Sequence, residues 1–157
     1  MYNDVAGIQQ QYVFVSEINK TIDDAHQSIK KIRKINSQLE AFIKQYENDE
    51  EVKALVERAK DLKTSFEDIE KALYQTQNRS NQDPLNFPIR LTNKLGHLSS
   101  LVTMDDFPPT DQDIQVKNEL TAEINDELNA YDKLISEEIE KFNQSFNELK
   151  LNYLFLE

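Results

Sequence analysis

The sequence contains no cysteine and no tryptophan, and it has only two glycines and four prolines in 157 residues. Without cysteine the chain cannot form disulfides or thiolate metal sites, although this does not fix the compartment in which the protein works. With so few glycines and prolines, the chain has few of the residues that favour tight turns. The composition therefore argues against a β-sandwich or β-barrel and favours long helices.

Basic residues are also scarce, because 18 lysines and arginines stand against 29 acidic residues, for a net charge of −11. A field of this sign repels phosphate backbones and anionic lipid, which argues against nucleic acid and membrane surfaces as partners. No apolar run approaches the roughly 20 residues of a membrane span, and the sequence does not open with a signal peptide.

The length suits one domain, residues 1–157, that is large enough to bury a core. The dipeptide Leu156-Glu157 often precedes a purification tag, and Met1 has the character of an added start residue. We therefore expect an excised domain of a larger protein.

Apolar residues recur at steps of three and four along four segments, which predicts an all-α fold. The predicted helices span about residues 4–46, 49–77, 88–103 and 110–153. In the first helix two rows share one face. One row is Ile8, Val15, Ile22, Ile29 and Ile43, and the other is Ile18, Ala25, Ile32, Leu39 and Tyr46. The later seams are Val52, Leu55, Ala59, Leu62, Phe66, Ile69 and Leu73; then Leu91, Leu95, Leu98 and Val102; then Leu120, Ile124, Leu128, Tyr131, Ile135, Ile139 (or Glu138), Phe142, Phe146, Leu149 and Tyr153.

The predicted lengths favour an antiparallel bundle of three long rods, with the middle rod broken near residues 78–88. The alternative is a four-helix arrangement in which the short third helix folds back. Two local ambiguities remain in the first helix. Asn36 either sits in the seam and fixes register or gives way to Ile35. The stretch from Tyr12 to Val15 is apolar on more than one face, so another helix or a neighbouring domain must cover it.

The segment "DPLNFPIRLTNKL" (83–95) interrupts the helical pattern, because Pro88 holds Phe87 extended. We predict a structural joint whose backbone groups are satisfied by the side chains of Asn86, Arg90 and Asn93. The alternative is a ligand or partner site built from the same groups. The candidate interaction or joint residues are therefore Tyr12, Phe14, Leu85, Asn86, Phe87, Arg90 and Asn93.

No motif predicts a catalytic residue, a metal site or a cofactor. The two histidines, His26 and His97, lack the Glu-x-x-His partners of a di-metal bundle. The acidic corner of Asp105, Asp106, Asp111 and Asp113 lacks the glycine and distal glutamate of an EF-hand loop, so helix capping is the better interpretation. Thr110 and Asp113 have the spacing of a capping box.

The stretch Pro84–Leu91, with Asn93–Leu95 and later Pro109-Thr110, resembles a pattern near the C-terminus of a bacterial family. Its members are large exported proteins built on sortilin-type, BNR-repeat β-propellers and often labelled glycosyl hydrolases. Thr92 departs from the asparagine usual in that pattern. The stretch Ile18–Leu39 is also similar to the region that precedes it in the family.

The resemblance implies a helical C-terminal domain, export from the cell, and a hydrolase label that would belong to the propellers. We expect a non-catalytic interaction or structural module that docks on the upstream propeller or on another protein. The stretches Tyr12–Val15 and Leu85–Arg90 would make the contact. The alternatives are part of a glycan hydrolase with its catalytic site elsewhere, and a self-associating coiled-coil adaptor.

Overall fold

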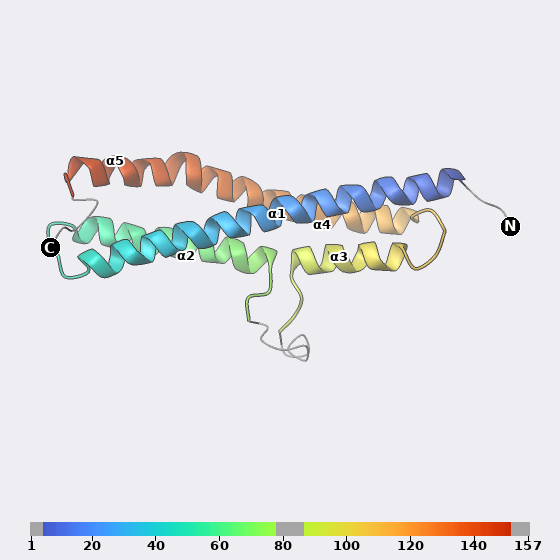
Figure 1. Cartoon of the computed structure of the whole chain (residues 1–157), viewed down its shortest axis with the longest axis horizontal. Helices are drawn as coiled ribbons and strands as arrows, with labels where there is room; N and C mark the ends of the chain where they lie inside the picture. Colours follow the sequence, from blue (N-terminus) through green and yellow to red (C-terminus); the bar gives the residue numbers. More distant parts are fainter. Residues whose placement is uncertain (1–4, 78–86, 152–157) are drawn as a thin grey trace.

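One helix of 42 residues, α1, runs the length of the molecule (Figure 1). The computed structural model describes residues 5–77 and 87–151. Two shorter helices, α2 and α3, lie end to end beside α1, and the third rod returns along both (Figure 1). This confirms the bundle of three rods with a broken middle rod. The elements are α1 (Val5–Tyr46), α2 (Lys53–Leu73), α3 (Leu91–Val102), α4 (Asp111–Lys133), the π-helical segment η2 (Leu134–Ile139) and α5 (Glu140–Glu148).

The two rows of α1 are buried to different degrees. The second row is buried throughout, whereas in the first row only Ile29 and the interrupting Asn36 are buried. All seven predicted seam residues of α2, from Val52 to Leu73, are buried. In the described third rod, which consists of α4, η2 and α5, only Ile124, Tyr131 and Phe142 are buried. The seam between α1 and the middle rod is therefore the core, and the third rod packs more loosely against it.

The second helix begins at Lys53 and not at the predicted residue 49, because Asp49 builds a turn first. The Asp49 carboxylate accepts the Glu51 N–H at 2.9 Å, and its backbone carbonyl accepts the Val52 N–H at 3.2 Å. This local side-chain bond competes with helix formation. The helix starts only after Val52, which is buried.

The break in the middle rod is wider than predicted, because α2 ends at Leu73 and α3 starts at Leu91. Tyr74 is extended, and the Thr92 hydroxyl donates to the Leu73 carbonyl at 2.9 Å. The Gln75 amide donates to the Pro88 carbonyl at 2.7 Å. Thr92 and Gln75 are both buried, so they supply partners to backbone groups that the break removes from the helices. The start of the predicted joint segment, residues 83–86, lies outside the described residues.

The third rod begins as predicted and ends earlier. Thr110 and Asp113 form the full capping box at the start of α4. The helix stops at Glu148, because Lys150 adopts a positive φ of 49° that ends a helix. The predicted extension to residue 153 is therefore wrong at residues 149–151, and Tyr153 lies outside the described part of the chain.

The π-helical segment falls where the sequence pattern left Ile139 and Glu138 as alternatives. A π turn inserts one extra residue into the helical ladder, which rotates the later side chains about the axis. Ile139 packs against the core, and Glu138 meets α2 through an ion pair. The segment lets both residues face the bundle.

Thr92 provides a test of the joint. Replacing it with valine keeps the side-chain shape but leaves the buried Leu73 carbonyl without its donor, which should cost about 1–3 kcal/mol. Urea unfolding monitored by circular dichroism measures the loss. Thr64→Val is the matched control, since the Thr64 hydroxyl is exposed and bonds only within its own helix. It should shift stability by less than about 0.5 kcal/mol. An equal loss in both variants would contradict the role of Thr92.

Candidate functional site

Among the described residues, the predicted site residues are divided between the start of α1 and the joint. Phe87 is half-buried, and Arg90 and Asn93 are exposed. Leu85 and Asn86 lie outside the described residues. The hydrogen bonds described across the joint come from Thr92 and Gln75. Because residues 78–86 lie outside the described part of the chain, the roles of Arg90 and Asn93 in satisfying this backbone stay a prediction.

The predicted contact stretch in α1 is also divided between core and surface. Phe14 is only 4% exposed, and the Lys117 ammonium lies 5.1 Å from the centre of its ring. Lys117 also pairs with Glu17. Tyr12, by contrast, is 73% exposed. Phe14 therefore belongs to the folded core, and the bundle itself covers this face of the stretch.

Exposed apolar side chains gather at the end of the molecule where α1 begins, α3 ends and α4 begins (Figure 1). Among the described residues, eleven large apolar side chains are exposed, and eight of them belong to this end. We call these eight the apolar end: Val5, Ile8, Tyr12, Val13, Leu101, Met104, Phe107 and Ile114. The other three are Tyr74 and Ile89 beside the joint and Leu149 after α5.

Gln11 fixes the geometry of the apolar end. Its side-chain amide lies 2.7 Å from the Val102 carbonyl, 2.7 Å from the Asp105 carbonyl and 3.3 Å from the Phe107 carbonyl. These are carbonyls that the end of α3 and the following corner leave without helical donors. The corner that carries Met104 and Phe107 is thus tied to α1, so their exposure is built into the fold.

The acidic and histidine residues form no metal centre in the parts of the chain that the structure describes. Asp113 is engaged in the capping box, as predicted. His26 packs edge-on against Tyr74, with ring centres 6.2 Å apart. The described carboxylate that is most buried belongs to Glu70, and it is held by the Arg33 guanidinium at 2.6 Å. These groups therefore have structural partners.

One shallow hollow beside the joint gathers charges of both signs. Arg90, Lys94, Glu123 and Glu127 line it together with apolar residues. Partial burial, and to a lesser degree the neighbouring Asp126, raises the pKa of Glu127. Glu123 is exposed and lies one turn away on the same helix. A glycosidase requires two carboxyls facing each other across a cleft, which neighbours on one helix face do not provide.

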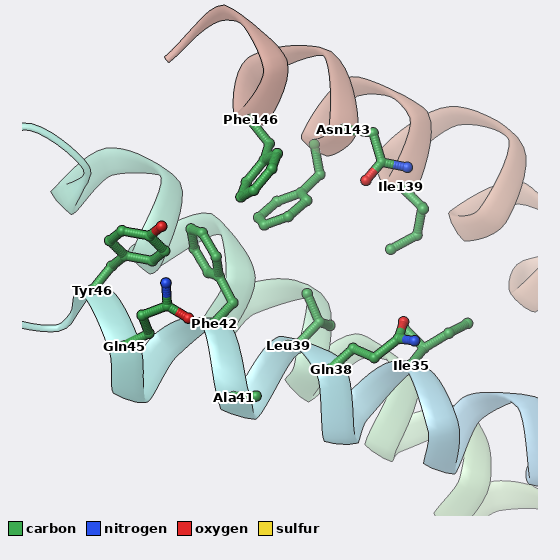
Figure 2. Close-up of a pocket in the computed structure, with 11 residues that line it drawn as sticks. Ile35, Gln38, Leu39, Ala41, Phe42, Gln45, Tyr46, Ile139, Asn143 and Phe146 are labelled. Carbon is green, nitrogen blue, oxygen red and sulfur yellow. The ribbon is translucent and has the colours of Figure 1, made fainter. Parts of the chain in front are cut away.

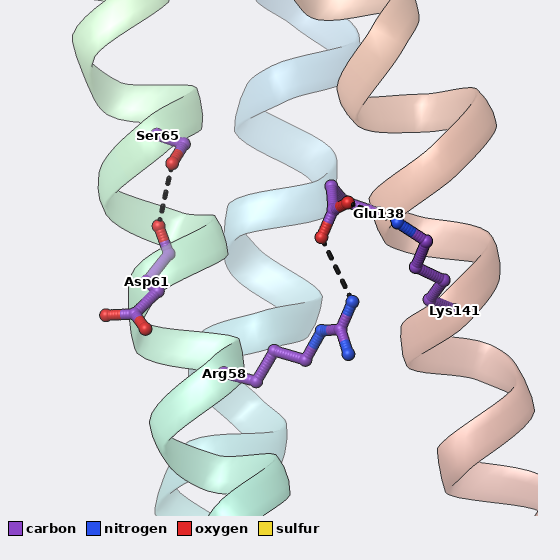
Figure 3. A network of polar contacts seen from close by, with 5 residues as sticks. All are labelled: Arg58, Asp61, Ser65, Glu138 and Lys141. Atoms are coloured by element: carbon purple, nitrogen blue, oxygen red, sulfur yellow. Dashed lines mark hydrogen bonds and ion pairs between the residues drawn. The ribbon is translucent and has the colours of Figure 1, made fainter.

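Polar contacts hold the π-helical segment to α2 (Figure 3). The Arg58 guanidinium donates to Glu138 at 3.0 Å, and the Lys141 ammonium donates to the other oxygen of the same carboxylate at 2.9 Å. Within α2 the Ser65 hydroxyl donates to the Asp61 carbonyl at 3.0 Å. Glu138 is therefore the polar link between the middle rod and the third rod at this level.

The contacts of Glu138 also predict that folding stability depends on pH. The hydrogen bond from Lys141, and after it the charges of Lys141 and the contact with Arg58, lower the pKa of Glu138 below its ordinary value of 4.5. As the pH falls, the Glu138 carboxyl takes up its proton in the unfolded chain before it does so in the folded chain. The contribution of the Glu138 carboxylate to folding stability is therefore present above about pH 4.5 and is lost as the pH falls through the lower folded pKa.

Glu138→Gln should therefore flatten the acid side of a stability profile measured by urea unfolding between about pH 7 and about pH 3. Glu137→Gln is the control, because Glu137 is exposed and adjacent. An unchanged profile in Glu138→Gln would contradict the assignment.

Comparisons of the chain with protein-family models, with curated proteins and with solved structures find no match. The family resemblance therefore rests on the residues quoted above alone. None of the helices in the described part of the chain has the combined length and apolar character needed to cross a membrane.

Proposed function

We propose that this chain is a non-catalytic helical module that docks on another protein surface through its apolar end. The observation that supports the proposal is the concentration of exposed apolar side chains there, with Met104 76% and Phe107 74% exposed. Monomeric proteins rarely expose contiguous apolar patches larger than roughly a few hundred Å², and patches above that size mark sites of association. Anchoring by Gln11 gives the patch a fixed shape, which lowers the entropy cost of docking.

The resemblance at Pro84–Leu95 suggests the partner. On this hypothesis the chain is the C-terminal part of an exported protein, and the apolar end packs on the propeller that precedes α1. The apolar end fits this reading because it carries the start of α1, where a preceding domain would be joined (Figure 1). Any hydrolase activity would belong to the propellers.

The two alternatives make different demands. If the chain is part of a glycan hydrolase whose catalytic site lies elsewhere, hydrolysis requires the rest of that protein. A glycosidase site within this chain would require facing carboxylates in a cleft, and the Glu123–Glu127 hollow does not supply that arrangement. A self-associating adaptor would use the same apolar end between two copies. Sedimentation of the chain at high micromolar concentration distinguishes this case from docking on a propeller.

The double variant Tyr12→Ser, Phe107→Ser tests the docking surface. The reading frame upstream of Met1 is expected to encode propeller repeats, and binding of that propeller to this chain is measured by titration calorimetry. Loss of two aromatic anchors should weaken binding by about tenfold or more. Both side chains are about three-quarters exposed, so the melting temperature should change little.

Leu149→Ser is the matched control, since Leu149 is an exposed apolar residue at the opposite end of the bundle. It should leave binding unchanged. Equal affinity of the double variant and the unaltered chain would overturn the docking surface. An upstream frame without propeller repeats would overturn the proposed parent protein.

A further inference from the structure

The groove between α1 and the η2–α5 part of the third rod is crossed by the aromatic rings of the bundle itself (Figure 2). The Phe42 ring lies 5.3 Å from the Phe142 ring and 5.9 Å from the Phe146 ring, measured between ring centres. These contacts belong to the packing of the third rod on α1. The charged surface of α1 offers a different kind of contact.

A group of basic residues interrupts the acidic surface of this chain. Four exposed basic residues within five positions of α1 form what we call the basic cluster: Lys30, Lys31, Arg33 and Lys34. No acidic residue occurs between Asp24 and Glu40, although acidic residues outnumber basic ones by 29 to 18 in the whole chain. The cluster is therefore a local field whose sign is opposite to that of the molecule.

The basic cluster departs from the way in which lysines are otherwise paired. Among the described residues, seven lysines pair with an acidic residue three or four positions away: Lys20, Lys44, Lys53, Lys60, Lys63, Lys71 and Lys141. At these spacings Lys30 has Arg33 and Lys34 instead. Within residues 5–77 and 87–151 the three lysines of the cluster form no ion pair. Like charges one turn apart destabilise a helix, and a local arrangement that opposes folding is expected at functional sites.

Arg33 has a fixed orientation within the basic cluster. Its Nε donates to the Glu70 carboxylate at 2.6 Å, and the Glu70 side chain is only 12% exposed. A guanidinium carries five N–H donors. The terminal nitrogens of Arg33, Nη1 and Nη2, form no hydrogen bond within the part of the chain that the structure describes. The Glu70 carboxylate therefore positions the guanidinium and leaves its outer N–H groups available to a further acceptor.

A hollow of about 300 Å³ adjoins the basic cluster where the end of α2 meets α1, and we call it the Tyr74 hollow. Lys30 and Arg33 line it together with His26 and Tyr74. The Tyr74 ring is 37% exposed and meets the His26 ring edge-on. The Tyr74 N–H donates to the Glu70 carbonyl at 2.8 Å. The last turn of α2 therefore positions both the aromatic wall of the hollow and the guanidinium of Arg33.

The rest of the lining narrows the class of ligand. Asp23 and Gln27 also line the Tyr74 hollow, and Asp23 lies about 10 Å from Lys30 along the helix axis. A phosphate group has only acceptor oxygens, so Asp23 would repel it. An acidic peptide segment carries both kinds of group, because its carboxylates accept from the cations while its backbone N–H groups donate to Asp23. The mixed lining therefore fits a peptide better than a phosphate.

We propose that the basic cluster and the Tyr74 hollow bind a short acidic segment of a partner protein. Its carboxylates accept from Lys30, Arg33 and Lys34, and its chain packs against the Tyr74 ring. The segment is short because the field of the cluster is local. Charges more than about 8 Å away are largely screened at physiological salt. A short segment therefore meets the cluster alone, whereas a long polyanion also meets the acidic surface around it.

This inference goes beyond the docking proposed for the apolar end and does not depend on it. Tyr12 of the apolar end and Lys30 of the basic cluster lie roughly 27 Å apart along the axis of α1. Either surface can fail its test without affecting the other.

The test uses the full chain and a fluorescein-labelled synthetic peptide of about ten residues, in which a run of about four glutamates stands between glycines and serines. A second peptide has glutamine in place of each glutamate. Fluorescence anisotropy should show saturable binding of the glutamate peptide, about tenfold tighter than the glutamine peptide at about 50 mM salt. The difference should narrow as salt is raised.

Two variants locate the binding. The double variant Lys30→Gln, Lys34→Gln should weaken binding of the glutamate peptide by about tenfold. Because it also removes like-charge repulsion within α1, its melting temperature should not fall. Tyr74→Ser removes the aromatic wall and should weaken binding by about fivefold, with thermal melts confirming that it folds. The matched control is Lys133→Gln, Lys150→Gln, which removes two exposed lysines outside the cluster and changes the net charge equally. It should bind as the unaltered chain does.

Four results would overturn the proposal. The first is the absence of saturable binding of the glutamate peptide. The second is an equal loss of affinity in the control and in Lys30→Gln, Lys34→Gln, which would mean that only the total charge acts. The third is tighter binding of a labelled oligothymidylate of about ten nucleotides than of the glutamate peptide, which would make a phosphate backbone the occupant. The fourth is self-association in sedimentation that Lys30→Gln, Lys34→Gln abolishes, which would make a second copy the occupant.

Discussion

The continuous apolar face of α1 is the constraint on which the rest of the bundle depends. A helix of 42 residues is about 63 Å long at 1.5 Å per residue, and its buried row has to be covered along nearly all of that length. Two helices joined by a break cover it from one side. The hydroxyl of Thr92 and the amide of Gln75 give partners to carbonyls that this break leaves open. The joint is thus a consequence of covering a long helix with two short ones.

The third rod covers what remains, but incompletely. It buries fewer side chains than the middle rod, and the π-helical segment changes the direction of its side chains where it approaches α2. The ion pair of Arg58 with Glu138 fixes it at that level. Apolar surface is therefore left uncovered at the start of α1, as the apolar end, and the docking proposed there follows from this incomplete coverage. The basic cluster lies on the exposed face of α1.

The seams of the four segments predicted the fold class and the order of the rods, because burial of an apolar stripe decides helix packing. The break was predicted from Pro88, but its width was not, since Thr92 and Gln75 act through hydrogen bonds that periodicity does not report. The later start of α2 was missed for the same reason, because Asp49 acts through a local hydrogen bond. Asn36 does sit in the seam, as one of the two interpretations held, and its buried Oδ1 has no hydrogen-bond partner among the described residues. Phe14 was predicted to contact the propeller or another protein, because it lies in a run of four apolar residues. Only the angular positions of the two residues around α1 decide that Phe14 is buried and Tyr12 is exposed. The contacts of Gln11 were not indicated by the sequence pattern. The π turn was indicated only by the choice between Ile139 and Glu138 as the seam residue.

Native-state hydrogen exchange read by mass spectrometry tests most directly whether the seam of α1 with the middle rod is the stable core. We expect the slowest amides between Ile18 and Leu39 in α1 and between Leu55 and Ile69 in α2, where the buried side chains concentrate. The amides of α5 should exchange faster, through local opening of the loosely packed end of the third rod. Protection of α5 equal to that of the centre of α1 would contradict a core confined to that seam.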